Sequence, residues 1–474
     1  MELMLKISGE IGTKSAPTRR RFLRVLASNA RAALRRQGIR GTVEPRWSRL
    51  FVRTDDPAAA SALSRVFGIH SIAQTIPVRF SSLEDLVAGA VPHLEGAVRE
   101  RTFALRVRRS GDHPFRSRDV AVALGDALLS ASAGVDLDHP DVELPIEISG
   151  DVARLLLDAV PGPGGLPVGV GGRALSLFSG GFDSPVATWM TMRRGMAMDL
   201  LVCDLGGCGQ VDAALGVARE LVGTWALGVE PVAHVVDLVP VVAALRARVD
   251  PGIRQVVLKR AMYRAGTLLA QRLGAEAVVT GEALGQVSTQ TLRNLSVAED
   301  AAGMPVLRPL IGMDKEEIIG RARQIGTHDA SARVQEHCNI ATGRVETAAR
   351  LHTVIGAEGR LDESFIESAV NRALRIDLMT WTPGPSPEHV VEEVPRDAVV
   401  VDVREPDEGP AVGDVRLPFG QVGEWSTGLE ASRTYLFVCS NGNRSEIVAH
   451  ELRRRGLDAY SLAGGIPRLP IRAA

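Results

Sequence analysis

A short apolar strand runs directly into a glycine and serine loop at Leu175-Ser176-Leu177-Phe178-Ser179-Gly180-Gly181-Phe182-Asp183-Ser184. Pro185 and the apolar residues 186–192 that follow are typical of a helix. Glycines let a backbone approach phosphate closely, and the amides at a helix N-terminus face the anion with the positive end of the helix dipole. Asp183 is suited to hold the Mg²⁺ that accompanies a nucleotide. The stretch predicts a phosphate-binding loop; the alternative is a plain serine-glycine turn before a helix.

Further strands of the same kind follow along the chain. Short apolar runs at 200–204, 232–236 and 277–280 alternate with helical stretches, which is the pattern of a doubly wound parallel sheet. Dense proline and glycine at 161–172 mark a boundary before this sheet. We therefore expect a nucleotide-binding α/β domain over residues 173–375.

The loop differs from a Walker A loop, in which a lysine directly follows the last glycine. It resembles the PP-loop of ATP pyrophosphatases, which implies cleavage between the α and β phosphates of ATP and adenylation of a carbonyl oxygen. Two later stretches, 280–291 and 307–318, resemble the 4-thiouridine synthases of the ThiI family. This resemblance makes Asp183 and Lys315 catalytic, with Lys315 on phosphate. The ATP contacts that it implies are Leu177, Phe178, Ser179, Gly180, Gly181, Asp183, Ser184, Lys259, Gly281 and Gln290.

One loop departs from the family pattern. After Gly206-Gly207 the chain reads Cys208-Gly209-Gln210-Val211-Asp212, which is longer than the family's usual stretch and lacks its histidine. Nucleotide contacts from this loop are therefore not carried over by the resemblance.

The first 160 residues alternate short strands with helices. Strands are predicted by alternating polarity and helices by apolar residues at helical spacing. The strands expected are 3–7, 49–53, 102–108 and 142–148, and the helices are 22–34, 62–67 and 120–130. Two small α+β units are expected, at 1–60 and 61–160.

Arginines crowd this part of the chain, which suits contact with phosphates, although a solvated helix face explains the same charge. The stretch 102–111, with Phe115 and residues 135–141, resembles the THUMP domain of RNA-modifying enzymes, and 6–11 with Lys14 resembles the ferredoxin-like domain that precedes it. This resemblance implies that both units grip tRNA by its shape and backbone, with affinity that falls as salt rises. The residues expected to contact tRNA are Lys6, Lys14, Arg19, Arg20, Arg106, Arg108 and Arg109.

The C-terminal part follows a proline-rich linker at 382–387 and is expected to form a small α/β domain over 390–474. Strands are predicted at 398–403 and 434–438, and a helix at 445–455.

The second strand ends in Cys439-Ser440-Asn441-Gly442-Asn443-Arg444-Ser445, so the thiol lies in a loop of amides at a helix N-terminus, which favours a thiolate. The loop resembles that of rhodanese domains, which implies a persulfide on Cys439. A cysteine phosphatase would have five residues between cysteine and arginine, and here there are four. A buried structural cysteine is the other alternative.

The remaining cysteines need separate explanations. Cys338 stands where the ThiI family has its second catalytic cysteine, which implies attack on Cys439 and a disulfide that a cellular reductant reopens. A plain exposed cysteine is the alternative. We interpret Cys203 and Cys208 as structural; with Cys338 they could instead ligate an iron–sulfur cluster, although their spacing is unusual for one.

The bulk properties agree with this organisation. At 474 residues the chain needs several domains, and 45% hydrophobic and 23% charged residues are ordinary for globular protein. No secretory signal or long apolar run is evident, so we expect a cytoplasmic protein without a membrane partner.

Taken together, the motifs resemble a 4-thiouridine synthase with a C-terminal rhodanese domain. The expected fold class is multidomain α+β and α/β, with ferredoxin-like, THUMP, PP-loop and rhodanese-like parts. The resemblance implies ATP, Mg²⁺ and no bound prosthetic group or structural metal, uridine 8 of tRNA as target, and a cysteine desulfurase as sulfur donor. It also implies sulfur transfer to a carrier protein for thiamine thiazole synthesis as a second activity. The rivals are an amide-forming PP-loop ligase and a tRNA-binding protein without catalysis.

Overall fold

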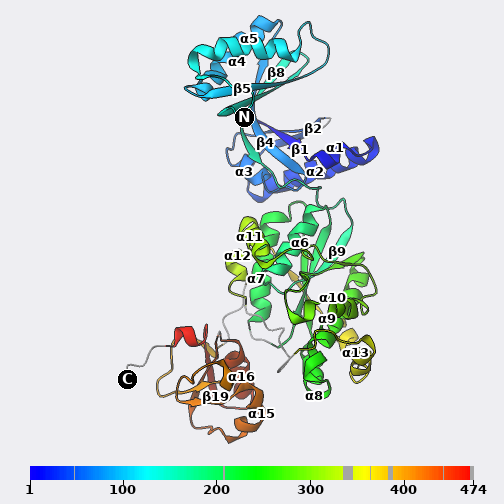
Figure 1. Ribbon diagram of the computed structural model, residues 1–474, viewed down its shortest axis with the longest axis vertical. Coiled ribbons are helices and arrows are strands. Elements are labelled where there is room, and N and C mark those ends of the chain that lie inside the picture. Colours follow the sequence, from blue (N-terminus) through cyan, green and yellow to red (C-terminus); the bar gives the residue numbers. More distant parts are fainter. Residues whose placement is uncertain are drawn as a thin grey trace. The chain divides into compact units, whose positions relative to one another are not determined.

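The computed structural model describes residues 1–46, 49–206, 209–334, 345–362, 364–382, 388–440 and 442–469 (Figure 1). The chain forms two compact units, the first containing Met1–Gly171 and the second most of the remainder. Within the described residues, no helix is both long and apolar enough to cross a membrane.

The first unit is built on one eight-stranded sheet of order β2-β3-β1-β4-β8-β7-β5-β6. Its strands are β1 (Glu2–Ile7), β2 (Thr42–Arg46), β3 (Arg49–Arg53), β4 (Ile69–Arg79), β5 (Thr102–Ser110), β6 (Gly134–Val135), β7 (Val142–Ser149) and β8 (Val152–Pro161). Its helices are α1 (Gly9–Gly12), α2 (Ala16–Arg36), α3 (Ala59–Leu63), α4 (Leu83–Val98) and α5 (Ser117–Leu128), with the 3₁₀ turn η1 (Leu129–Ala131).

Two separate cores lie on this one sheet. The first forms under α2, where Leu26, Ala30 and Leu34 recur every fourth residue and are at most 2% exposed. The second forms where α4 and α5 pack side by side over β5, β7 and β8 (Figure 1). The two cores are bridged by β4, which contributes Ile72 to the first and Val78 to the second and pairs antiparallel with β8 over most of its length.

Most predicted elements of this unit are confirmed, and one is wrong. The expected helix at 62–67 is instead α3, which ends at Leu63, and the chain then turns at Gly68, whose φ is +98°. Residues 64–68 therefore form turns instead of helix, and the left-handed conformation at Gly68 redirects the chain so that β4 begins at Ile69.

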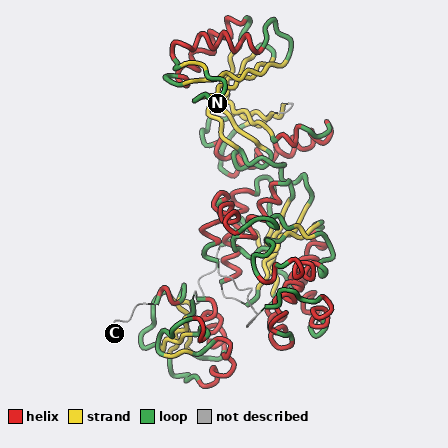
Figure 2. Tube along the Cα trace, in the orientation of Figure 1, coloured by secondary structure: helices red, strands yellow, loops and turns green. Residues whose placement is uncertain are grey.

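The second unit contains a six-stranded sheet of order β13-β12-β9-β10-β11-β14, parallel except for β14. Helices cover both of its faces (Figure 2). The strands are β9 (Arg173–Leu177), β10 (Ala197–Asp204), β11 (Val232–Asp237), β12 (Ala277–Val279), β13 (Val306–Leu307) and β14 (Leu374–Asp377). The helices are α6 (Asp183–Arg193), α7 (Gln210–Trp225), α8 (Val239–Arg248), α9 (Pro251–Leu273), α10 (Leu292–Glu299), α11 (Lys315–Ile325), α12 (His328–Ser331), α13 (Leu351–Glu358) and α14 (Ser364–Asn371), with the 3₁₀ turn η2 (Ser288–Gln290). The predicted doubly wound sheet is confirmed.

The C-terminal residues form a five-stranded parallel sheet of order β15-β19-β18-β16-β17. Its strands are β15 (Val390–Val391), β16 (Val399–Asp402), β17 (Val415–Arg416), β18 (Thr434–Val438) and β19 (Asp458–Leu462). Its helices are α15 (Val422–Trp425) and α16 (Asn443–Arg454), with 3₁₀ turns η3 (Pro406–Glu408), η4 (Phe419–Gln421), η5 (Ser426–Gly428) and η6 (Ile466–Arg468). The predicted strands at 398–403 and 434–438 and the helix at 445–455 are confirmed within a few residues.

Candidate active site

The glycine and serine loop leaves β9 at the point where the strand order reverses. In the sheet, β10 and β11 lie on one side of β9, and the later strands β12 and β13 lie on its other side. The order in which strands are added therefore changes direction at β9. Ligands of open α/β sheets bind at the carboxyl ends of strands at such a switch point. The amino acid sequence therefore puts residues 179–184 at the position in the sheet where a ligand is expected.

Ser184 holds the loop in shape. Its hydroxyl oxygen accepts hydrogen bonds from the backbone N–H groups of Ser179 and Gly180, each at 3.1 Å. Gly180 has a φ of +82°, and a Cβ there would lie 2.7 Å from the Cα of Ala214, so only glycine fits. Ser184 thus shapes the loop, a role that the sequence did not indicate.

A cavity of about 400 Å³ opens against this loop. This volume is within the range of small-molecule sites. Of the predicted ATP contacts, eight line it: Leu177, Ser179, Gly181, Asp183, Ser184, Lys259, Gly281 and Gln290. Phe178 does not, because its side chain is buried in the core at 2% exposure, and Gly180 lies against Ala214 instead.

Lys315 reaches Asp183 from the first turn of α11. Its ammonium donates to Asp183 Oδ1 at 2.7 Å, and Gln286 Nε2 donates to Oδ2 at 2.9 Å. A capping box fixes the start of the helix, since Asp314 accepts from the Glu317 N–H at 2.8 Å and Glu317 accepts from the Asp314 N–H at 3.0 Å. Two of the four predicted catalytic residues, Asp183 and Lys315, therefore meet at the mouth of the phosphate loop.

A buried carboxylate, Glu282, organises the opposite wall of the cavity. It is 6% exposed, and it accepts from Lys259 Nζ at 2.7 Å, from Arg308 Nε at 2.9 Å and from the Tyr263 hydroxyl. Burial raises the pKa of the Glu282 carboxyl, but these three partners outweigh burial and hold the pKa at about 2. Burial and the Glu282 charge raise the pKa of Tyr263, so its hydroxyl stays protonated and donates.

This cluster is not evident from the sequence, although one signal points to it. Lys259 and Tyr263 are four residues apart on α9 and therefore face the same way. Lys259 was predicted to contact ATP, and its charge is paired with Glu282. The cluster fixes the end of β12 and with it Gly281, which packs on the phosphate loop.

Two orphaned polar atoms show that the cavity suits a polar ligand. In the part of the chain that the structure describes, Gln210 Oε1 and Gln286 Oε1 are buried without a hydrogen-bond partner, and both residues line the cavity. A buried polar atom without a partner costs free energy, which a ligand donor such as an adenine amino group or a ribose hydroxyl removes. Gln210 belongs to the stretch 208–212 that departs from the family pattern.

Gly281→Ala should weaken nucleotide binding. A Cβ at Gly281 would lie 2.8 Å from the carbonyl carbon of Asp183 and from the backbone nitrogen of Ser184, so the loop must shift. A displaced phosphate loop should reduce ATP affinity by about tenfold or more. Isothermal titration with ATP measures this, with Gly216→Ala as the control because a Cβ on Gly216 of α7 meets nothing within 4 Å. Equal ATP affinities for Gly281→Ala and the control would contradict the close packing.

The second candidate centre is Cys439, which directly follows β18. Its side chain is buried, and Sγ accepts from the Gly442 N–H at 3.2 Å and lies 3.7 Å from the Ser445 hydroxyl. Ser445 is fixed by Ser461 and by the Gly442 carbonyl, both at 2.9 Å. The sulfur thus faces the first turn of α16, where amide donors favour negative charge.

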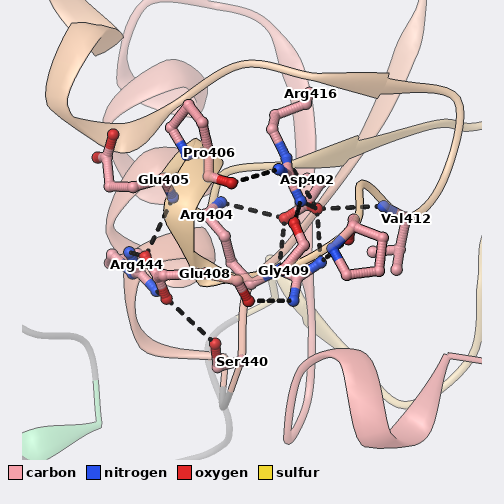
Figure 3. A network of polar contacts seen from close by, with 11 residues as sticks. Asp402, Arg404, Glu405, Pro406, Glu408, Gly409, Val412, Arg416, Ser440 and Arg444 are labelled. Atoms are coloured by element: carbon pink, nitrogen blue, oxygen red, sulfur yellow. Dashed lines mark hydrogen bonds and ion pairs between the residues drawn. The ribbon is translucent and has the colours of Figure 1, made fainter.

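An ion-pair network holds the segment beside this loop (Figure 3). Asp402 has a fully buried side chain and accepts from Arg404 NH2 and Arg416 NH2, each at 2.9 Å. Burial raises the pKa of the Asp402 carboxyl, but the two arginines outweigh it and hold the pKa at about 2. The same arginines donate to backbone carbonyls of the segment 406–410 and so fix its path.

Asp402→Asn should destabilise the C-terminal sheet by about 3 kcal/mol at pH 7, because two arginines lose a buried partner. Native-state hydrogen exchange in β16 and β18 measures this loss, with Glu430→Gln as the control because Glu430 forms only an exposed pair with Arg433. Because the pKa of Asp402 is depressed in the folded state, its contribution to the free energy of unfolding is complete above about pH 4 and is lost as the pH falls through about 2. The difference in pepsin susceptibility between wild type and variant should therefore close over that range, and a constant difference would contradict the assignment.

Three predicted residues lie outside the described residues: Cys338, Cys208 and Asn441. The residues on either side of the segment 335–344, Val334 and Val345, both line the cavity. Cys203 lies in β10 and is 5% exposed within the core of the sheet, as expected of a structural cysteine.

The residues predicted to bind tRNA all lie in the first unit. Some are next to the core under α2, and the others are on β5, next to the core under α4 and α5. Lys14 and Arg20 are exposed around the start of α2, with Arg19 and Lys6 half-buried. On β5, Arg106 and Arg108 share one exposed face, because side chains two residues apart in a strand point the same way. Arg109 points the other way and donates to the Gly111 carbonyl of its own turn at 3.0 Å. Arg106 also has internal partners, since it donates to Glu143 Oε1 and to the Leu137 carbonyl, each at 2.9 Å.

Comparison with known proteins agrees with this arrangement. The family model described as "Thiamine biosynthesis protein (ThiI)" matches residues 169–362, the "ThiI ferredoxin-like domain" matches 2–73, and the "THUMP domain" matches 80–158. A tRNA sulfurtransferase of Desulfurococcus amylolyticus is 38% identical and covers 98% of this chain and 97% of its own. One of Photorhabdus laumondii is 36% identical, with 97% and 98% covered. A crystal structure of a 4-thiouridine synthetase–RNA complex with bound ATP superposes with a TM-score of 0.68 at 28% identity, covering 79% of this chain and 98% of that one.

Proposed function

The chain belongs to the ThiI family of tRNA sulfurtransferases, and on that premise we propose that it uses ATP to replace the 4-oxygen of uridine 8 in tRNA with sulfur from a persulfide on Cys439. The observation that carries the proposal is the pairing of two centres in one chain. One is a cavity of about 400 Å³ against a phosphate loop, and the other is a thiol that accepts a hydrogen bond from a loop amide.

In the first step the uridine 4-oxygen attacks the α-phosphorus of ATP, and pyrophosphate leaves. The loop amides and the start of α6 would bind the phosphates, and Lys315 would stabilise charge that develops on them. Asp183 is the carboxylate that would hold Mg²⁺, and the ion would supply positive charge next to the phosphates. Lys315 and Gln286 keep Asp183 oriented for this role.

In the second step the terminal sulfur of the Cys439 persulfide attacks C4, and AMP leaves. The Cys338 thiolate then attacks Sγ of Cys439, which releases the thiolated base and leaves a disulfide between the two cysteines. A cellular dithiol reduces that disulfide, and a cysteine desulfurase loads the next persulfide.

The domain roles follow from the same proposal. Residues 1–60 and 61–160 would be the ferredoxin-like and THUMP domains that grip tRNA, 173–375 the adenylating domain, and 390–474 a rhodanese-like domain. The parallel sheet around Cys439, with its loop at the start of α16, supports the last assignment.

The function is tested with unmodified tRNA, ATP, Mg²⁺, cysteine and a desulfurase. Formation of 4-thiouridine is followed by its near-ultraviolet absorbance. Product from the wild-type protein supports the proposal. ATP turnover to AMP without a thiolated base would favour a PP-loop ligase, and RNA binding without ATP turnover would favour a non-catalytic tRNA-binding protein.

Sulfur transfer to a carrier protein for thiamine thiazole synthesis is a second candidate activity. It is the second activity that the resemblance of the Cys439 loop to rhodanese domains implies. Carrier thiocarboxylate formation that needs Cys439 but not Asp183 would establish it.

A further inference from the structure

Glu408 lies directly against the Cys439 loop (Figure 3). Its carboxylate accepts from both terminal nitrogens of Arg444, with NH2 at 2.6 Å from Oε2, and the Ser440 hydroxyl lies 3.4 Å from the same oxygen. Arg444 and Ser440 both belong to the sequence stretch that begins at Cys439, and the Gly442 N–H and Ser445 hydroxyl of the same stretch contact the sulfur. Glu408 therefore contacts this loop at two points although it is 36 residues from Arg444.

The ion pair between Glu408 and Arg444 cancels the positive charge that Arg444 brings to the Cys439 loop. In sequence, Arg444 is the one charged residue among Cys439-Ser440-Asn441-Gly442-Asn443-Arg444-Ser445. The bidentate contact with Arg444 holds the pKa of Glu408 at about 2, so its carboxylate is ionised at any physiological pH and cancels the guanidinium charge.

Glu408 is held in place by the rest of the network. It ends η3, and Arg404 donates to its carbonyl at 3.3 Å and to that of Pro410 at 2.7 Å. Arg416 donates to the carbonyl of Gly409 at 2.8 Å. Because both arginines bind the buried Asp402, the segment carrying Glu408 is tied to the ends of β16 and β17.

We propose that Glu408 is a specificity-determining residue, which makes the Cys439 loop select a protein-borne persulfide over small anionic sulfur donors such as thiosulfate. The inference rests on the proposed role of Cys439 as a persulfide carrier. With thiosulfate, the Cys439 thiolate would attack the outer sulfur, the S–S bond would break, and sulfite would leave with the electron pair. Thiosulfate is a dianion, so its approach to the Cys439 thiolate is favoured only by an unpaired positive charge beside the sulfur. The Arg444 guanidinium would supply that charge, but its ion pair with Glu408 neutralises it. A desulfurase persulfide carries at most one negative charge and is brought by protein–protein contact, so it does not need that charge.

The test compares thiosulfate with cysteine plus desulfurase as sulfur donors to the full chain. The persulfide on Cys439 is measured by mass spectrometry, and kcat/KM for thiosulfate by sulfite release with cyanide as acceptor. Glu408→Gln keeps the shape of the side chain but frees the Arg444 charge, so kcat/KM for thiosulfate should rise about tenfold, mainly through a lower KM. The control is Glu430→Gln, which removes one negative charge elsewhere in the same sheet domain and should leave both donors unaffected.

A double variant separates charge from loop shape. Glu408→Gln combined with Arg444→Gln restores a neutral pair, so thiosulfate use should return to the wild-type level. If Glu408→Gln uses thiosulfate no better than wild type, or if the gain persists in the double variant, the proposal is wrong. Wild-type protein that takes no sulfur on Cys439 from the desulfurase would instead refute the persulfide role, and the thiosulfate comparison would still decide the effect of Glu408.

Discussion

Cys439→Ser should abolish the transfer of sulfur to tRNA while leaving the ATP-dependent adenylation of tRNA, with release of pyrophosphate, intact in the first turnover. Serine keeps the size of the side chain and its place at the start of α16, but it cannot carry a persulfide. Loss of the nucleophile in a covalent mechanism typically costs on the order of 10³-fold or more in rate. The measurement is a parallel assay of 4-thiouridine and of pyrophosphate released in the first turnover on the same tRNA sample.

Cys203→Ala is the matched control, because Cys203 is also a buried cysteine but lies within β10, in the core of the nucleotide-binding sheet. It should retain sulfur transfer. If Cys439→Ser forms 4-thiouridine at the wild-type rate with the desulfurase, sulfur reaches tRNA without this residue and the role assigned to the C-terminal sheet is wrong.

Lys315→Ala should slow AMP formation by about 10²- to 10³-fold, because it removes a cation from the mouth of the phosphate loop and leaves Asp183 without its partner at 2.7 Å. The loss should appear in kcat as well as in KM, since charge on the phosphates grows as pyrophosphate leaves. Persulfide loading of Cys439 should be unchanged, because it does not use ATP. Rates of AMP and pyrophosphate release measure the first effect, and mass spectrometry the second.

Glu316→Gln is the control for Lys315→Ala, since Glu316 is the next residue of α11 and is exposed. It should leave AMP formation within about twofold of wild type. If Lys315→Ala behaves like this control, Lys315 serves only to orient Asp183, and the phosphate contact must come from another residue.

The parts predicted well from sequence are those whose chemistry is local. The loop 179–184 combines strand, glycines and helix start within ten residues, and the stretch from Cys439 to Ser445 does the same at the start of α16. The alternation of strands and helices was enough to predict a parallel sheet. Short-range patterns thus located both candidate centres.

The parts that sequence did not predict depend on contacts between distant residues. Lys315 and Asp183 are 132 residues apart, and no local pattern pairs Glu282 with Arg308 or Glu408 with Arg444. The single sheet of the first unit was also missed, because β4 crosses from one core to the other while sequence patterns report only one core at a time. Ser184 looked like a ligand donor, but its hydroxyl accepts from two loop amides.

A single-turnover experiment examines most directly whether one chain both activates tRNA and delivers the sulfur. The protein is loaded with ³⁵S persulfide on Cys439, freed of desulfurase and cysteine, and mixed with unmodified tRNA and Mg²⁺, with or without ATP. The account predicts that label moves to tRNA in an amount that matches the loaded Cys439, only when ATP is present, and that a disulfide between Cys338 and Cys439 remains. Label that stays on Cys439 while ATP is converted to AMP, or label that moves without ATP, would contradict it.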